Sequence, residues 1–219
     1  DPRMIPQIAI VDAGLMQGAP QHVTLAAGLD AVTQVIEPYL SIKSNLMTDA
    51  ICRAAIPVGL RELRAVVEND APNAWDAMAW VSTCGGLALA NAGLGAVHGF
   101  AGVIGGKTNA PHGEICGTLL PAVLESHSRK AEEHTDIHGR LSWVLEQIDT
   151  HFAMGRKGEG LIELRLWSTT LGLRSLKELG LSSGDYGAVA DAAVKASSMK
   201  GNPFSLTHLD LIEILRAAS

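Results

Sequence analysis

The sequence has few cysteines, no excess of basic residues and no long unbroken apolar run, and each shortage excludes a class of protein. Its three cysteines, Cys52, Cys84 and Cys116, are widely spaced and form no CxxC pair. This pattern is typical of free thiols in a reducing compartment, so we expect a cytoplasmic protein rather than a disulfide-stabilised one. Lys and Arg number 17 against 23 Asp and Glu, and the basic residues are scattered. Nucleic-acid binding is therefore not expected.

A membrane span is not expected either. The longest stretch without a formal charge, residues 77–106, is interrupted by Ser82, Asn91, His98 and repeated glycines. This composition favours a buried core helix over a membrane helix. The chain starts at Asp1 rather than at a Met and has no signal-peptide pattern, which is consistent with a fragment of a longer protein.

Length and periodicity predict the fold class. With 219 residues, 47% of them hydrophobic, and a mean hydropathy of +0.18, the chain can bury a large core as one domain spanning residues 1–219. Residues 8–11 (IAIV) predict a short β-rich opening, after which apolar residues recur at helical spacing. Thr207 and Asp210 form a capping-box pattern before the last helix. We expect an all-α helical bundle with a short β-rich N-terminal segment.

Two histidines predict a metal site. His98 and His112 lie fourteen residues apart and are joined by a glycine-containing connection. Imidazole is the commonest protein ligand for divalent transition metals, and two imidazoles can converge on one ion. Upstream, residues 28–37 (GLDAVTQVIE) have helical apolar spacing that places Asp30 and Gln34 on one face. Asp30, His98 and His112 form an oxygen, nitrogen, nitrogen donor set of the kind that catalytic zinc or iron sites use.

Three further features favour a structural interpretation. Cys116 lies four residues after His112 and could be a ligand, but a small apolar residue facing the bundle is the preferred interpretation. His134 and His138 are also four residues apart, in a segment so polar that it favours a solvated surface. Lys107 lies in the connection between the two metal-site histidines, where it could contact an anionic substrate, although most loop lysines contact only water.

Three motifs in sequence order carry a family resemblance. They are GLDAVTQVIE at residues 28–37, ANAGLGAVH at residues 90–98 and PHG at residues 111–113. Together they resemble the iron-containing (group III) alcohol dehydrogenases, a family that includes the maleylacetate reductases. The resemblance extends over essentially the whole chain, from residues 8–12 to residues 202–216.

The resemblance implies a ligand set. The family binds its metal through an Asp, a His four residues later and two further histidines fourteen residues apart. Residue by residue, these positions hold Asp30, Gln34, His98 and His112. A divalent iron or zinc ion is therefore implied, with Gln34 as a weak or absent ligand, because an amide oxygen is a poorer donor than imidazole. Gly102 stands where many family members have another His, so the usual proton relay is in question.

The resemblance also implies that the family's nucleotide-binding domain is absent from this sequence. Family members bind NAD or NADP through a preceding α/β domain with a glycine-rich turn, and this sequence has no strand, glycine turn and helix of that kind. It is thus expected to be the C-terminal part of a dehydrogenase for a small alcohol or aldehyde, inactive alone. The alternative is a non-catalytic helical domain that has lost its metal and serves folding or assembly. A homo-oligomer is compatible with both interpretations.

Overall fold

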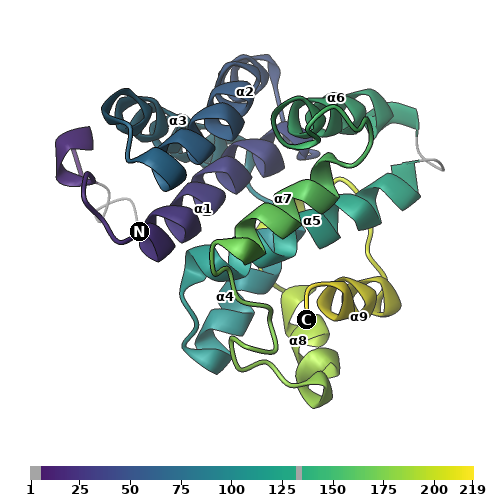
Figure 1. Ribbon diagram of the computed structural model, residues 1–219. Helices are drawn as coiled ribbons and strands as arrows, with labels where there is room; N and C mark the ends of the chain where they lie inside the picture. The colour runs from purple at the N-terminus through teal and green to yellow at the C-terminus, as the bar shows by residue number, and fades with distance from the viewer. Residues whose placement is uncertain (1–5, 132–134) are drawn as a thin grey trace.

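The computed structural model describes residues 6–131 and 135–219, and its regular structure is helical (Figure 1). The α-helices are α1 (Gln21–Leu40), α2 (Leu46–Asn69), α3 (Pro72–Ala92), α4 (Ala96–Thr108), α5 (His112–Ala131), α6 (Thr135–Phe152), α7 (Gly160–Thr170), α8 (Tyr186–Ala193) and α9 (His208–Ala217). Short 3-10 helices lie at η2 (Ala13–Leu15), η3 (Ser183–Asp185) and η4 (Ser198–Gly201). The all-α class expected from the sequence matches this architecture.

The β-rich N-terminal segment predicted for residues 8–11 was wrong. These residues form no strand, and Ile8 and Ile10 are 79% and 87% exposed. A strand is stabilised by hydrogen bonds to a neighbouring strand, and the described residues contain none that could pair with this one. The chain instead turns at η2, where the Asp12 side chain accepts a hydrogen bond from the Gly14 N–H.

Helix α1 lies at the centre of the fold. It packs against α2 and α3 on one side and against α5 on the other (Figure 1). Leu29, Val32 and Ile36 are buried along its length. A helix that is apolar around most of its circumference must be covered on several sides, which accounts for this central position.

The second half of the fold is built on α4 and α5. These two helices pack together, α8 lies against α4, and α9 packs on α5 and α8. The capping box predicted for Thr207 and Asp210 is present at the start of α9. Helices α1, α4 and α5 meet inside the molecule, and they carry all four residues expected from the sequence to form the metal site.

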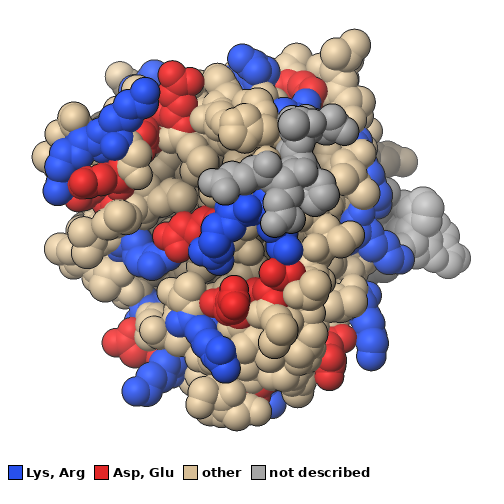
Figure 2. All heavy atoms as spheres, turned by 90° about the vertical axis from the view of Figure 1, so that its right-hand side faces the viewer, with Lys and Arg blue, Asp and Glu red and all other residues tan. Residues whose placement is uncertain are grey.

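Three sequence expectations concern membrane spans and the protein surface. In residues 6–131 and 135–219, no single helix combines the length and apolar character of a membrane span, although α3 and α4 pass this test as a pair bent by 101°. Acidic and basic side chains are intermixed on the face shown in Figure 2, and no continuous basic area appears there. His138 is exposed, whereas His134, its expected neighbour on a polar helix, lies outside the described residues.

Candidate metal centre

Four donor side chains converge where α1, α4 and α5 meet. They are Asp30 on α1, His98 on α4, and His112 and Cys116 on α5. One donor atom from each lies within 4.8 Å of all the others. His98 Nε2 is 3.2 Å and His112 Nε2 is 3.9 Å from Asp30 Oδ1. The two imidazoles and the carboxylate expected from the sequence are thus brought to one place.

Asp30 Oδ1 behaves as a ligand atom would. It is buried, yet it accepts no hydrogen bond from the described residues, and His98 Nε2 lies near it without hydrogen-bond geometry. An unsatisfied buried carboxylate oxygen is costly, so its partner is expected to be a cation. Carboxylate oxygen and imidazole nitrogen are donors that both zinc and iron accept. The residues therefore fit a divalent metal ion.

Glu37 positions His98. This nearly buried carboxylate accepts a hydrogen bond of 2.7 Å from the Val97 N–H at the first turn of α4. Its other oxygen lies 2.7 Å from His98 Nδ1 and 3.4 Å from the His98 backbone nitrogen. Because an ionised carboxylate only accepts, Nδ1 carries the proton and Nε2 is left to face Asp30. The negative charge also suits the positive N-terminal end of α4.

Glycine at two positions lets the helices approach closely. Gly95 precedes α4, and a Cβ atom there would lie 2.9 Å from the Glu37 carboxylate. Gly113 follows His112 on α5, and a Cβ atom there would lie 2.4 Å from the backbone oxygen of Ala26 on α1. Both contacts are closer than a side-chain carbon tolerates. The glycines around the two histidines therefore set the distance between α1 and its neighbours.

Gln34 lies beside the cluster rather than among its donor atoms. Its Nε2 donates a hydrogen bond of 3.0 Å to Asp30 Oδ2, whereas the contacts of Asp30 with the two imidazoles are made by Oδ1. Its side chain also packs on α3, where a Cβ atom at Gly85 would lie 2.9 Å from Gln34 Cβ. In this position Gln34 orients the carboxylate of Asp30.

The electrostatics of the cluster favour a cation. Burial lowers the pKa of His98, but contacts with Asp30, Cys116 and Glu37 outweigh it and raise that pKa to about 12. Burial raises the pKa of Asp30, while His98 and His112 lower it, so that the net shift is downward. Burial raises the pKa of the Cys116 thiol to about 12. Positive charge is thus stabilised between two carboxylates, whether a proton or a metal ion supplies it.

The cluster is reached from one side. The His112 side chain is 51% exposed, whereas that of His98 is 6% exposed. A hollow of about 310 Å³ borders the cluster at Asp30, and its lining also includes Pro111 and Gly113, the two neighbours of His112 in the chain. This hollow is where a small molecule could reach an ion held by the cluster.

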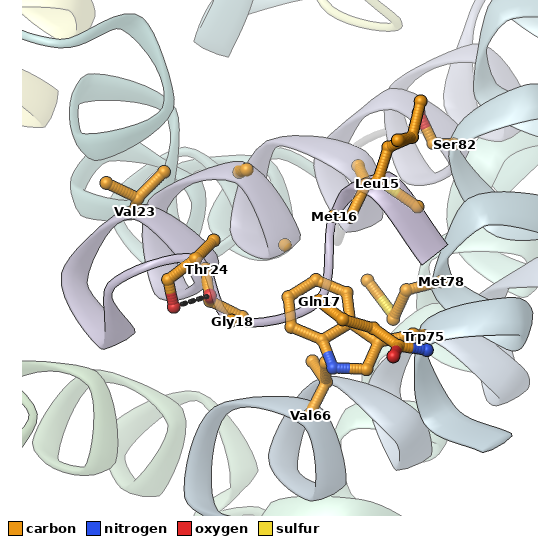
Figure 3. A pocket seen from close by; sticks show the side chains of 14 residues that line it. Leu15, Met16, Gln17, Gly18, Val23, Thr24, Val66, Trp75, Met78 and Ser82 are labelled. Atoms are coloured by element: carbon orange, nitrogen blue, oxygen red, sulfur yellow. Dashed lines mark hydrogen bonds between the residues drawn. The ribbon is translucent and has the colours of Figure 1, made fainter. Parts of the chain in front are cut away.

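A larger cavity lies elsewhere. It has a volume of about 410 Å³ and is formed by the N-terminal segment around η2 with helices α1, α2 and α3 (Figure 3). Its lining is mainly apolar and includes Met16, Val66, Trp75 and Met78. None of the four donor residues lines it, so it belongs to a different part of the molecule.

Sequence reasoning missed one donor of the cluster, Cys116, and the residue that positions His98, Glu37. Cys116 was assigned to the core, and it is indeed completely buried, but its Sγ lies 3.5 Å from His112 Nε2 and 3.9 Å from His98 Nε2. Its spacing of four residues from His112 was the available signal. Glu37 gave no local signal, because its partners Val97 and His98 are sixty residues away. Lys107, considered as a substrate contact, forms an ion pair of 2.9 Å with Asp185.

The fold and the cluster define a helical domain whose donors could hold a metal ion. Residues 24–219 match the model of the C-terminal part of the Fe-containing alcohol dehydrogenase family. The chain therefore belongs to the iron-containing alcohol dehydrogenase family and corresponds to its C-terminal domain. The resemblance inferred from the sequence motifs is confirmed.

Relatives agree with this assignment. The chain is 32% identical to the lactaldehyde reductase of Escherichia coli K12 over 220 residues, which cover 100% of this chain and 56% of that protein. It is 32% identical to the 1,3-propanediol dehydrogenase of Citrobacter freundii, covering 99% and 56% of the two chains. It thus spans about half the length of these relatives.

Solved structures share the fold. The alcohol dehydrogenase of Oenococcus oeni superposes with a TM-score of 0.80 at 29% identity, covering 95% of this chain and 54% of that one. The iron-containing alcohol dehydrogenase of Thermococcus thioreducens superposes with a TM-score of 0.83 over 100% of this chain and 56% of that one. At 23% identity, this second likeness supports the fold alone.

Proposed function

We propose that this chain is the metal-binding domain of an NAD(P)-dependent oxidoreductase that acts on a small alcohol or aldehyde. The observation that carries the proposal is the convergence of Asp30, His98 and His112 in a member of the iron-containing alcohol dehydrogenase family. The names lactaldehyde reductase and 1,3-propanediol dehydrogenase, carried by two relatives, support the substrate class.

Each residue has a role in this proposal. Asp30, His98 and His112 hold the ion, which when bound supplies a Lewis acid that polarises the substrate oxygen. Glu37 keeps His98 in the tautomer that leaves Nε2 free for the ion. The hollow at Asp30 admits a small alcohol or aldehyde to the cluster.

The nicotinamide cofactor belongs to another part of the protein in this proposal. The described residues contain no strand followed by a glycine turn and a helix, which is the usual cradle for a dinucleotide. We further propose a cytoplasmic location, which is supported by three free, buried thiols.

The test is a metal titration of the chain after treatment with a chelator. We expect one zinc or iron ion per chain by calorimetry and metal analysis, and no binding of NAD or NADP at micromolar concentration. The variant for comparison with the wild-type chain is His112→Ala, which removes one proposed ligand. Because the His112 side chain is half-exposed, its removal should have little effect on the core. A wild-type chain that binds no stoichiometric ion would instead support a domain that has lost its metal site. Micromolar binding of NAD(P) would show that the cofactor site is misplaced.

A further inference from the structure

We propose that Cys116 is the fourth protein ligand of this metal ion and takes the role that the family resemblance gives to the position of Gln34. This inference rests on the metal binding proposed above, and it concerns which atoms surround the ion. The family's usual donors are one carboxylate and three imidazoles, whereas this chain would use one carboxylate, two imidazoles and one thiolate.

The position of Cys116 in α5 brings its sulfur to the cluster. Cys116 lies four residues after His112, so the two side chains share one face of the helix. Gly117, the next residue, packs against Leu29 on α1, where a Cβ atom would lie 2.5 Å from the Leu29 side chain. This close contact holds that turn of α5, and with it the thiol, against the helix that carries Asp30.

The distances suit tetrahedral coordination. Zinc bonds of about 2.0–2.2 Å to nitrogen or oxygen and about 2.3 Å to sulfur place neighbouring donor atoms about 3.3–3.7 Å apart. Cys116 Sγ lies 3.5 Å from His112 Nε2 and 3.9 Å from His98 Nε2. His98 Nε2 lies 3.2 Å from Asp30 Oδ1. His112 Nε2 lies 3.9 Å from Asp30 Oδ1, and all four donor atoms lie within 4.8 Å of one another, so the widest pairs must close by up to about 1 Å to surround one ion.

A second observation makes the thiol part of a site rather than an isolated buried cysteine. The buried Oδ1 atom of Asp30 lacks a hydrogen bond within the described residues, and it faces the same space as the thiol and the two imidazoles. The other two cysteines, Cys52 and Cys84, are buried but do not belong to the cluster. Cys116 is therefore the thiol that can complete the coordination.

Gln34 is held away from this role. Its amide nitrogen donates to Asp30 Oδ2, and its amide oxygen faces α3, where it would lie 3.4 Å from a Cβ atom at Gly85. An amide binds a metal through its oxygen, because the amide nitrogen has no free lone pair to offer. Gln34 would have to break its hydrogen bond and rotate before it could coordinate the ion.

Coordination by sulfur has chemical consequences. The ion replaces the proton of the Cys116 thiol, which is released to solvent, and no oxidation or reduction is involved. With one thiolate and one carboxylate, a divalent ion and its ligands carry no net charge, whereas one carboxylate and three imidazoles leave a charge of +1. A thiolate also favours zinc over iron among the family's metals. The exposed side of His112 still leaves room for substrate as a fifth ligand.

Cobalt(II) reports sulfur ligation directly. The chain, freed of metal with a chelator, is titrated with cobalt(II) and followed by absorption spectroscopy. We expect one cobalt ion per chain and a thiolate-to-cobalt charge-transfer band in the near ultraviolet. Cys116→Ser should lose this band and bind cobalt at least tenfold more weakly, whereas Cys84→Ser, a change of another buried thiol, should keep both. In Cys116→Ser/Gln34→His, the new imidazole should restore affinity without the band.

A second measurement needs no variant. X-ray absorption of the zinc-loaded wild-type chain should show one sulfur neighbour at about 2.3 Å. A wild-type chain that binds cobalt or zinc with only nitrogen and oxygen neighbours would overturn the role of Cys116 and leave the proposed function standing. A wild-type chain that binds neither ion would overturn both.

Discussion

The carboxylate of Glu37 allows the sharpest test of how the site is organised. In Glu37→Gln the side chain keeps its shape but has a single accepting oxygen, where the native carboxylate serves Val97 and His98 together. If the amide oxygen stays with the Val97 N–H, the amide NH₂ group faces His98 Nδ1. The imidazole must then accept at Nδ1 and carry its proton on Nε2, the atom that faces Asp30. The variant therefore favours the wrong tautomer for metal binding.

The expected loss of metal affinity follows from other metal sites, in which residues that hydrogen-bond a metal-binding histidine have been replaced. Loss of the partner that orients a metal-binding histidine weakens metal affinity about 10- to 100-fold, or about 1.4–2.8 kcal/mol. Stability should also fall by about 1–3 kcal/mol, because hydrogen bonds to a charged acceptor are lost at the start of α4. Zinc affinity is measured by competition with a chelator, and stability by thermal unfolding without metal.

The control makes the same substitution at an ion pair outside the site, that of Glu125 on α5. Glu125→Gln removes the 3.1 Å contact with Arg165 but lies outside the cluster, so zinc affinity should be unchanged. If Glu37→Gln loses stability yet binds zinc with wild-type affinity, Glu37 supports the fold and does not set the tautomer of His98.

Three further predictions concern other parts of the molecule. Gly113→Ala should cost about 1–3 kcal/mol of stability in thermal unfolding and weaken zinc binding, because its Cβ would collide with the backbone of Ala26. The control is Gly106→Ala, at a helix position with open space around it, which should stabilise the chain by about 0.5–1 kcal/mol in the same assay. Gln34→His should tighten zinc binding in calorimetry, since it adds an imidazole one turn from the carboxylate, and unchanged affinity would mean that position 34 cannot reach the ion. Burial lowers the pKa of His127 to about 4, so the unfolded chain takes up more protons below about pH 6.5 and stability should fall by about 2 kcal/mol between pH 7 and 5. In His127→Phe this part of the pH dependence should disappear from denaturant unfolding curves, and an unaltered slope would refute the assignment to His127.

Much of the site could be predicted because its signals are local. The helical spacing of residues 28–37 placed Asp30 and Gln34 on one face of what is α1. The spacing of His98 and His112 around a glycine-rich connection suggested convergence, and their helices α4 and α5 do pack together. Backbone periodicity and motif order together were sufficient for this much.

The remaining features depend on contacts that no local pattern encodes. Residues 8–11 have the composition of a strand, but whether a strand forms depends on a partner, and none lies among the described residues. Glu37 resembles any acidic residue on a helix until α4 is placed against it. A buried structural thiol and a thiol among donor atoms share the same sequence pattern, so Cys116 could be assigned only from its distances to the two histidines.

In the proposed site, side chains of α1, α4 and α5 together hold one metal ion. The most direct measurement is anomalous diffraction at the zinc edge from crystals of the zinc-loaded chain. We expect one strong peak within about 2.0–2.2 Å of Asp30 Oδ1, His98 Nε2 and His112 Nε2. A chain that crystallises with these three atoms free of zinc, or with zinc only at surface residues such as His138, would contradict it.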